Sequence, residues 1–217
     1  MFKLSACGAV SMAPAQPHRP LDLAALVGSE GWSRLPAAVR RRFAVGHAET
    51  VYEGRMDLAC SAVGRAYAVV ARLFGGPLST ARVDALPTRV RVRADARGGV
   101  IWERQFAGRA GAPGRIVRST KLQGADGGLI ERTVGGLAMH LEVFEERGAL
   151  VFRSRSYFFD LFGWQLPVPA WLAPGTCRAE HQDLGPGRFR FTLAMDHPWW
   201  GRTFQQSGVF IDPDGSA

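Results

Sequence analysis

Downstream of Pro87 the chain alternates between apolar and polar residues with a period of two, in one segment after another. In segment 88–95, for example, the two valines fall on one side and the three arginines on the other. Successive side chains of a β-strand point to opposite faces, so this alternation predicts strands with one buried face. A looser alternation starts the series near residue 50. Nine or ten strands are predicted, over Thr50–Ala59, Thr88–Asp95, Val100–Phe106, Ile116–Leu122, Leu129–Val134, Leu137–Glu145, Ala149–Phe159, Thr176–Leu184, Arg188–Met195 and Arg202–Ile211.

Short turns join these segments, among them Gly98-Gly99 and Gly185-Pro186-Gly187. Short turns connect antiparallel neighbours, because parallel strands need crossover connections of about a dozen residues or more. The expected sheet is therefore an antiparallel meander, and so many twisted strands curl into a barrel or a half-barrel.

Two helices are predicted before the main series. The first carries Trp32, Leu35, Val39 and Phe43 on one side. The second begins after Ser61, carries Val63, Tyr67, Val70 and Phe74 on one side, and ends at Gly75-Gly76-Pro77. Apolar stripes at helical spacing are typical of helices packed on a sheet.

The expected fold class is therefore a β-rich α+β domain with two N-terminal helices packed on the barrel. We expect a single domain over residues 21–212, with a disordered tail over 1–20 and a short tail over 213–217. No internal repeat or linker divides the chain.

Charge and cysteine usage exclude several classes of function. The net charge is +8, but 25 of the 27 basic residues are Arg and they are spread along the chain, which argues against a dedicated nucleic-acid surface. Three widely spaced Cys predict neither a disulfide framework nor a zinc motif, and a reducing, cytoplasmic location follows. No apolar run approaches the roughly 20 residues of a membrane helix, so no membrane span is expected.

One apolar loop interrupts the meander between residues 161 and 174. It contains Trp164, Trp171 and three prolines, which remove hydrogen-bond donors and are expected to block both helix and ladder. Two interpretations stay open. The loop seals the end of the barrel, or it forms a lid over a pocket.

Spaced motifs along the chain occur in a characteristic order. The loop reads Gly163-x-x-Leu166-Pro167-x-Pro169-x-x-Leu172-x-Pro174. The other motifs are Leu35-Pro36-x-x-Val39-Arg40, Tyr52-x-Gly54, Trp102-x-Arg104-x-Phe106, Arg118-Ser119, Leu129-Ile130-Glu131-Arg132, Gly187-Arg188-Phe189-x-Phe191 and His197-Pro198-x-x-Gly201-Arg202.

In this order the motifs resemble the family called domain of unknown function 4166, over almost the whole chain from Leu21 to Ile211. The resemblance implies an accessory role, because members of the family often look like a C-terminal companion of a saccharopine-dehydrogenase-like or short-chain reductase. An NAD(P)-dependent reductase is therefore an implied partner. This chain has no Gly-x-Gly-x-x-Gly motif of its own, and no cofactor is expected.

The most informative polar residues are Arg104, Arg118 and Glu131. Arg104 shares a strand face with Trp102 and Phe106, and Arg118 is expected on an apolar face of the next strand. A charge on an apolar face is costly unless it is paired. Either Glu131 neutralises one or both arginines inside the barrel, or the arginines bind a carboxylate or phosphate head group there.

Histidine and cysteine suggest a weaker alternative. Cys177, His181 and Asp183 share a strand face, which is compatible with a metal site or an activated thiol, but this spacing is common by chance. We expect neither a metal site nor a catalytic group.

The function favoured by these observations is non-enzymatic binding of an apolar or amphipathic small molecule, accessory to a reductase. The candidate ligand-binding residues are Trp102, Arg104, Phe106, Arg118, Glu131, Trp164 and Trp171. Two alternatives remain: a protein-interaction or regulatory domain without a ligand, and an unrecognised enzyme acting on a lipid-like substrate.

Overall fold

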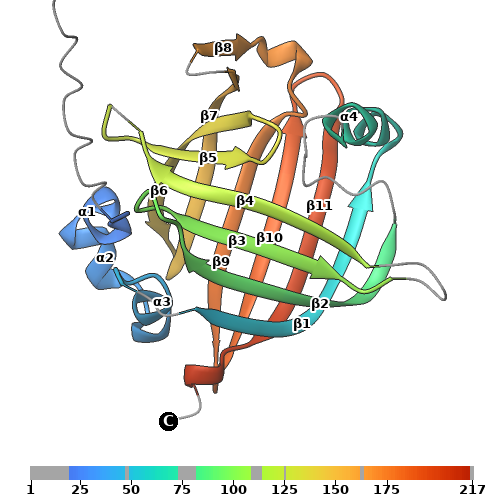
Figure 1. The fold of residues 1–217 in the computed structure, drawn as a ribbon. Coiled ribbons are helices and arrows are strands. Elements are labelled where there is room, and N and C mark those ends of the chain that lie inside the picture. Colours follow the sequence, from blue (N-terminus) through green and yellow to red (C-terminus); the bar gives the residue numbers. More distant parts are fainter. Residues whose placement is uncertain are drawn as a thin grey trace, which may run out of the picture.

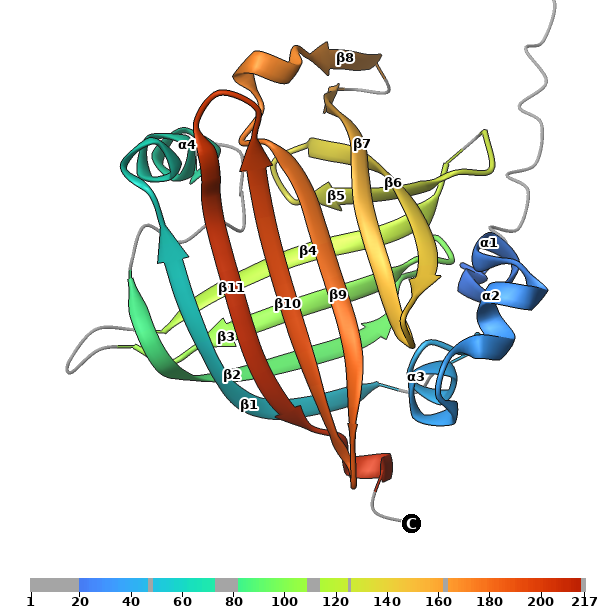
Figure 2. The same ribbon diagram turned by 180° about the vertical axis from the view of Figure 1, so that it is seen from behind.

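The computed structural model describes residues 20–46, 49–72, 82–108, 114–124, 126–161 and 164–215. Within these ranges, ten strands form a closed antiparallel barrel, and an eleventh, β8, pairs only with β7 (Figures 1 and 2). The strands are β1 Thr50–Cys60, β2 Val83–Ala94, β3 Val100–Phe106, β4 Arg115–Gln123, β5 Leu129–Thr133, β6 Leu137–Glu146, β7 Ala149–Leu161, β8 Trp164–Val168, β9 Thr176–Gly185, β10 Arg188–His197 and β11 Gly201–Ile211.

Each barrel strand pairs with the next barrel strand along the chain, and β1 pairs with β11 to close the ring. Among the described strands, closure of the ring leaves an unpaired edge only at β8, and a closed ring removes the edges on which another chain could pair. The predicted meander and its ten strands are confirmed, with boundaries shifted by a few residues.

The loop between β7 and β9 differs from the prediction that its prolines block both ladder and helix. Trp164–Val168 forms β8, with Pro167 opposite Phe158 of β7, and Ala170–Leu172 forms the short 3₁₀ helix η1. Proline is tolerated here because β8 is an edge strand, where a missing N–H leaves no ladder partner unsatisfied.

The first predicted helix is wrong in extent, because it is two helices. These are α2 Ser29–Arg34 and α3 Ala37–Arg42, separated by Leu35 in an extended conformation with ψ of 141°. The ring of Pro36 disfavours a helical conformation at the residue before it. A further short helix, α1 Leu23–Val27, precedes them and begins where Ala25 N–H donates to Asp22 Oδ1 at 3.0 Å.

The second predicted helix is α4 Ala62–Arg72, but it packs on a different side from the one expected. Its buried residues are Gly64, Ala68 and Ala71, while Val70 of the predicted stripe is 56% exposed. Gly64 allows the close approach, since a Cβ at this position would lie 2.2 Å from Thr203 O of β11. The predicted helix end at Gly75-Gly76-Pro77 and most of the predicted N-terminal tail lie outside the described residues.

The helices lie at opposite ends of the barrel (Figures 1 and 2). At the end where β1 finishes at Cys60 and β10 at His197, α4 covers the opening; we call this the α4 end. At the end where β1 begins at Thr50 and β9 finishes at Gly185, α3 lies against β9; we call this the α3 end.

The barrel interior is filled mainly by aromatic and branched side chains. Phe204, Phe210 and Leu150 are almost fully buried, and the rings of Phe189 and Phe210 stack with centroids 5.5 Å apart. These contacts leave only small spaces in the middle of the barrel, which bears directly on where a ligand can lie.

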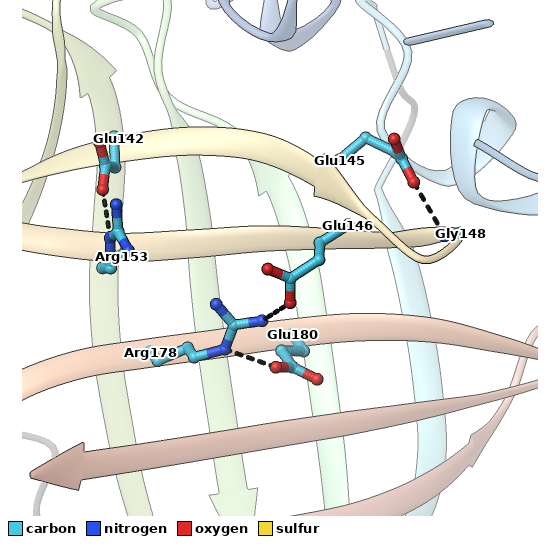
Figure 3. Close-up of polar contacts among 7 residues, drawn as sticks. All are labelled: Glu142, Glu145, Glu146, Gly148, Arg153, Arg178 and Glu180. Atoms are coloured by element: carbon cyan, nitrogen blue, oxygen red, sulfur yellow. Dashed lines mark hydrogen bonds and ion pairs between the residues drawn. The ribbon is translucent and has the colours of Figure 1, made fainter. Parts of the chain in front are cut away.

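The outer wall carries many of the arginines, and several of them lie beside a carboxylate on the same or a neighbouring strand. Figure 3 shows three such contacts across β6, β7 and β9: Arg153 with Glu142, and Arg178 with both Glu146 and Glu180. Glu142, Glu146 and Glu180 are therefore all held in ion pairs on this wall. None of the described helices has the length and apolar character needed to cross a bilayer.

Candidate functional site

Strand β3 places Trp102, Arg104 and Phe106 inside the barrel, as their shared face predicts. All three are buried, with exposed fractions of 5–7%. The guanidinium carbon of Arg104 lies 5.4 Å from the centre of the Phe191 ring on the opposite wall, a cation–π contact. The inward arginine therefore crosses an apolar interior.

Glu131 also points inward, but its ion-pair partner is Lys121 and not Arg118. Lys121 Nζ lies 2.9 Å from Glu131 Oε2, and the two residues are directly opposite each other in the β4–β5 ladder. Lys121 lies over two aromatic rings as well, 5.4 Å from the centre of Trp102 and 5.2 Å from that of Phe152.

The expectation that Arg118 enters the barrel is wrong. Its side chain is on the outer wall, where it binds Glu103 of β3, and the neighbouring Ile116 is 56% exposed. Strand β4 buries Val117, Ser119 and Lys121 instead, so its inward face is the opposite of the one inferred from Ile116. A nine-residue strand with an apolar residue on each face does not reveal which face is buried.

The buried charges do not cancel within this cluster. Burial raises the pKa of Glu131, but the charges of Lys121 and Arg104, together with the hydroxyl of Ser119 and a hydrogen bond from Lys121, outweigh burial and hold the pKa below its usual value. Burial lowers the pKa of Arg104, and the charge of Glu131 opposes that change. Glu131 pairs with Lys121 and its charge also acts on Arg104, so these three side chains together carry one net positive charge in an apolar surrounding.

His181 of β9 lies beside this cluster inside an aromatic cage. Its ring centre is 4.8 Å from that of Phe43, 5.4 Å from Trp102 and 5.1 Å from Phe191. Burial, and then the charges of Arg42, Lys121 and Arg104, lower its pKa well below 6.5. His181 is therefore neutral at physiological pH, and its buried Nδ1 has no hydrogen-bond partner among the described residues.

The thiol of Cys177 has the opposite character from an activated nucleophile. Burial raises its pKa to about 12, helped by the charge of Glu131. Asp183, which shares its strand face, lies 3.7 Å from the guanidinium of Arg42. Among the residues that the structure describes, no three His, Cys, Asp or Glu side chains come together to hold a metal ion.

Arg42, at the C-terminal end of α3, is the second buried cation that sequence reasoning missed. Its side chain is 1% exposed, its Nε donates to Asp212 Oδ2 at 3.1 Å, and it covers the Phe189 ring at 4.1 Å. The two Nη atoms are buried without a hydrogen bond among the described residues. Buried donors of this kind are commonly satisfied by ordered water or by a bound group.

A pocket of about 340 Å³ opens at the α3 end, between α3 and the turn that joins β2 to β3. Arg42 and Lys121 both line it. Its apolar lining includes Leu21, Leu23, Phe43, Val92 and Trp102. The pocket therefore combines an apolar wall with two buried cations.

The middle of the barrel does not contain the cavity expected around Arg104. The space that Arg104 lines, with Met56, Phe189 and Phe210, is only about 10 Å³. It is too small for an organic ligand, which needs roughly 300 Å³ or more. A ligand site built directly on Arg104 is thus disfavoured, and the pocket that Lys121 lines offers more space.

Trp164 and Trp171 are at the opposite end of the molecule from this pocket. Their side chains are 76% and 56% exposed, so neither seals the barrel or covers a described pocket as a lid.

The sequence contains a signal for the inward direction of Lys121 and His181. Each lies an even number of residues from a buried residue on the same strand, Val117 for Lys121 and Cys177 for His181.

Comparison with known proteins places the chain in a family. The model of the family described as "Domain of unknown function (DUF4166)" matches residues 35–210, which include the motifs around Trp102, Glu131 and Pro167. A search of curated proteins finds no match. The resemblance inferred from the ordered motifs is confirmed, and the chain belongs to the DUF4166 family.

Proposed function

We propose that the protein binds a small amphipathic anion in the pocket at the α3 end. The charged group of the ligand lies at Lys121, and its apolar part lies against Leu21, Leu23 and Phe43. The pocket volume, about 340 Å³, is within the range of small-molecule sites.

One observation carries this proposal: Lys121 pairs with Glu131 inside an apolar barrel, and the buried Arg104 beside them has no ion pair of its own among the described residues. A buried charge without compensation costs several kcal/mol, so an incoming anion gains by completing the cluster. His181 is neutral and does not compete for that anion. The two Nη atoms of Arg42 line the same pocket wall and make no hydrogen bond among the described residues, so they can supply further hydrogen bonds to the ligand.

The chemistry of these donors favours a carboxylate or a phosphate monoester over a neutral or cationic head group. Among the described residues Arg42 lies near two carboxylates, Asp212 and Asp183, whereas Lys121 lies near one, Glu131, so the preference for an anion depends mainly on Lys121. The reductase that the family resemblance implies would act on the compound bound in this pocket. Recovery of a reductase cross-linked to this protein in cells would support that part of the proposal.

Calorimetric titration with decanoate, decyl phosphate, decanol and decyltrimethylammonium tests the proposal on the whole protein. We expect the two anions to bind and the alcohol and the cation to bind at least about tenfold more weakly, because a charge-assisted hydrogen bond contributes about 1.5–3 kcal/mol. Equal affinity for decanol and decanoate, or no binding of either anion, would refute it.

The Lys121→Met variant provides the matched test. It leaves one cation, Arg104, and one carboxylate, Glu131, in the cluster, so the buried charges are equal in number while the anion site is lost. We expect the preference for decanoate over decanol to disappear. Arg118→Gln removes a positive charge from the outer wall and serves as the control, with unchanged affinity expected.

A further inference from the structure

A second surface, at the α4 end, is unusual for its exposed tryptophans. The exposed fractions are 76% for Trp164, 56% for Trp171, 70% for Trp199 and 54% for Trp200. Single exposed apolar residues need no explanation, but a contiguous group of large ones marks an interaction surface.

Contacts among the described residues gather three of these tryptophans. The hydroxyl of Tyr67 in α4 donates to Trp171 O of η1 at 3.2 Å, and its ring lies 6.2 Å from that of His197. The His197 ring is in turn 5.7 Å from Trp199 and 6.2 Å from Trp200, in the turn between β10 and β11. Both ribbon views show α4, η1 and this turn at the same end, with β8 leading into η1 (Figures 1 and 2).

The outward face of α4 extends this surface with cations. Arg65, Val69 and Arg72 follow one another at helical spacings of four and three, which places them on one face, and all three are exposed. Neither arginine has an ion-pair partner within the described parts of the chain, whereas the arginines of the outer wall in Figure 3 bind carboxylates. A third cation is close, because burial and then the charge of Arg72 lower the pKa of Arg115.

We infer that the α4 end binds the surface of a membrane that contains anionic lipids. Tryptophan side chains are enriched at the membrane–water interface, where the ring lies among head groups and the N–H remains hydrated. Unpaired Arg65 and Arg72 beside exposed Val69 and Val70 match an anionic plane, and the whole chain has a net charge of +8. This inference does not rest on the proposed ligand, whose pocket is at the other end.

Co-sedimentation of the whole protein with vesicles tests the inference. We use vesicles of phosphatidylcholine alone and of phosphatidylcholine with phosphatidylserine. We expect binding to the mixed vesicles that weakens as salt is added, and a lower affinity for phosphatidylcholine alone. Brominated lipids should quench part of the tryptophan emission, since the ring of Trp102 is buried in the barrel and stays out of reach.

Paired variants assign the binding to this surface. Arg65→Gln with Arg72→Gln should lower affinity for the mixed vesicles about fivefold per residue, from about 1 kcal/mol for each arginine near an anionic surface. Arg89→Gln with Arg91→Gln removes the same net charge from the outer wall and should have a smaller effect. Trp199→Ser with Trp200→Ser should lower the affinity and leave only the quenching that comes from Trp164 and Trp171, whereas Val209→Ser with Ile211→Ser, exposed on β11, should not change binding.

Three results would overturn the inference. The first is failure of the unaltered protein to sediment with mixed vesicles at low salt. The second is equal loss of binding in the outer-wall arginine variant and the α4 variant. The third is a concentration-dependent dimer that Trp199→Ser with Trp200→Ser dissociates, which would assign this surface to a second copy of the chain.

Discussion

Lys121 Nζ and Glu131 Oε2 lie 2.9 Å apart inside a closed barrel, and the charge of Glu131 also acts on Arg104, which has no ion pair of its own among the described residues. Ion pairs in such a place contribute little net stability, because each charge loses its hydration. The loss of unfolding free energy on removing one charged side chain instead depends on whether the remaining charges still balance.

The two single substitutions in this pair should therefore differ strongly. Glu131→Gln leaves two buried cations without a carboxylate and should lower the free energy of unfolding by about 3–5 kcal/mol, whereas Lys121→Met leaves a balanced pair and should change it by about 1 kcal/mol or less. Chemical denaturation at neutral pH measures both. Because the pKa of Glu131 is held below 4.5, its contribution is present above that pH and is lost on further acidification. Equal costs for the two variants would contradict a shared carboxylate.

His181 predicts a pH dependence in a different range. The folded protein holds this ring neutral, while the unfolded chain takes up a proton below pH 6.5, so acidification favours unfolding. The unfolding free energy should fall by about 1.4 kcal/mol per pH unit well below pH 6.5 through this group alone. In the His181→Phe variant this contribution to the pH dependence should be absent. Between pH 6.5 and 5, its unfolding free energy should therefore fall less steeply with decreasing pH than that of the unaltered protein. Parallel slopes would show that the ring is protonated in the folded state.

Gly64 predicts a substitution whose sign opposes helix propensity. In an exposed helix, replacing Gly with Ala stabilises by about 1 kcal/mol. A Cβ at Gly64, however, would lie 2.2 Å from the backbone oxygen of Thr203, so Gly64→Ala should destabilise by about 1–3 kcal/mol. Ala66→Gly, at an exposed position of α4, measures propensity alone and serves as the control. A stabilised Gly64→Ala protein would mean that α4 does not pack on β11.

Cys177 predicts a chemical reactivity. Its thiol is 3% exposed and its pKa is raised to about 12, chiefly by burial, so little thiolate forms at pH 8. Maleimide should leave Cys177 unmodified in the folded protein and modify it in denaturant, with peptide mass spectrometry as the readout. The partly exposed Cys60 provides an internal comparison. Rapid modification of Cys177 without denaturant would show that the interior opens.

The prediction from the sequence was correct for residues whose direction depends only on the alternation of apolar and polar residues within one strand. Trp102, Arg104 and Phe106 share one face because their spacing is even, and burial of that face follows from its composition. Arg118 was misplaced because β4 carries apolar residues on both faces, Ile116 outside and Val117 inside. In α4 the small side chains of Ala68 and Ala71 are buried in place of the larger apolar stripe, since close packing depends on what lies opposite.

By itself, the amino-acid sequence determined the number of barrel strands, their antiparallel order and the inward direction of Arg104, because alternation and turn chemistry act over a few neighbouring residues. Only the tertiary structure decided that Lys121 and not Arg118 meets Glu131, that the pocket opens at the α3 end, and that the tryptophans gather at the other. Those relations depend on the register between strands and on closure of the ring, which join residues far apart in the chain.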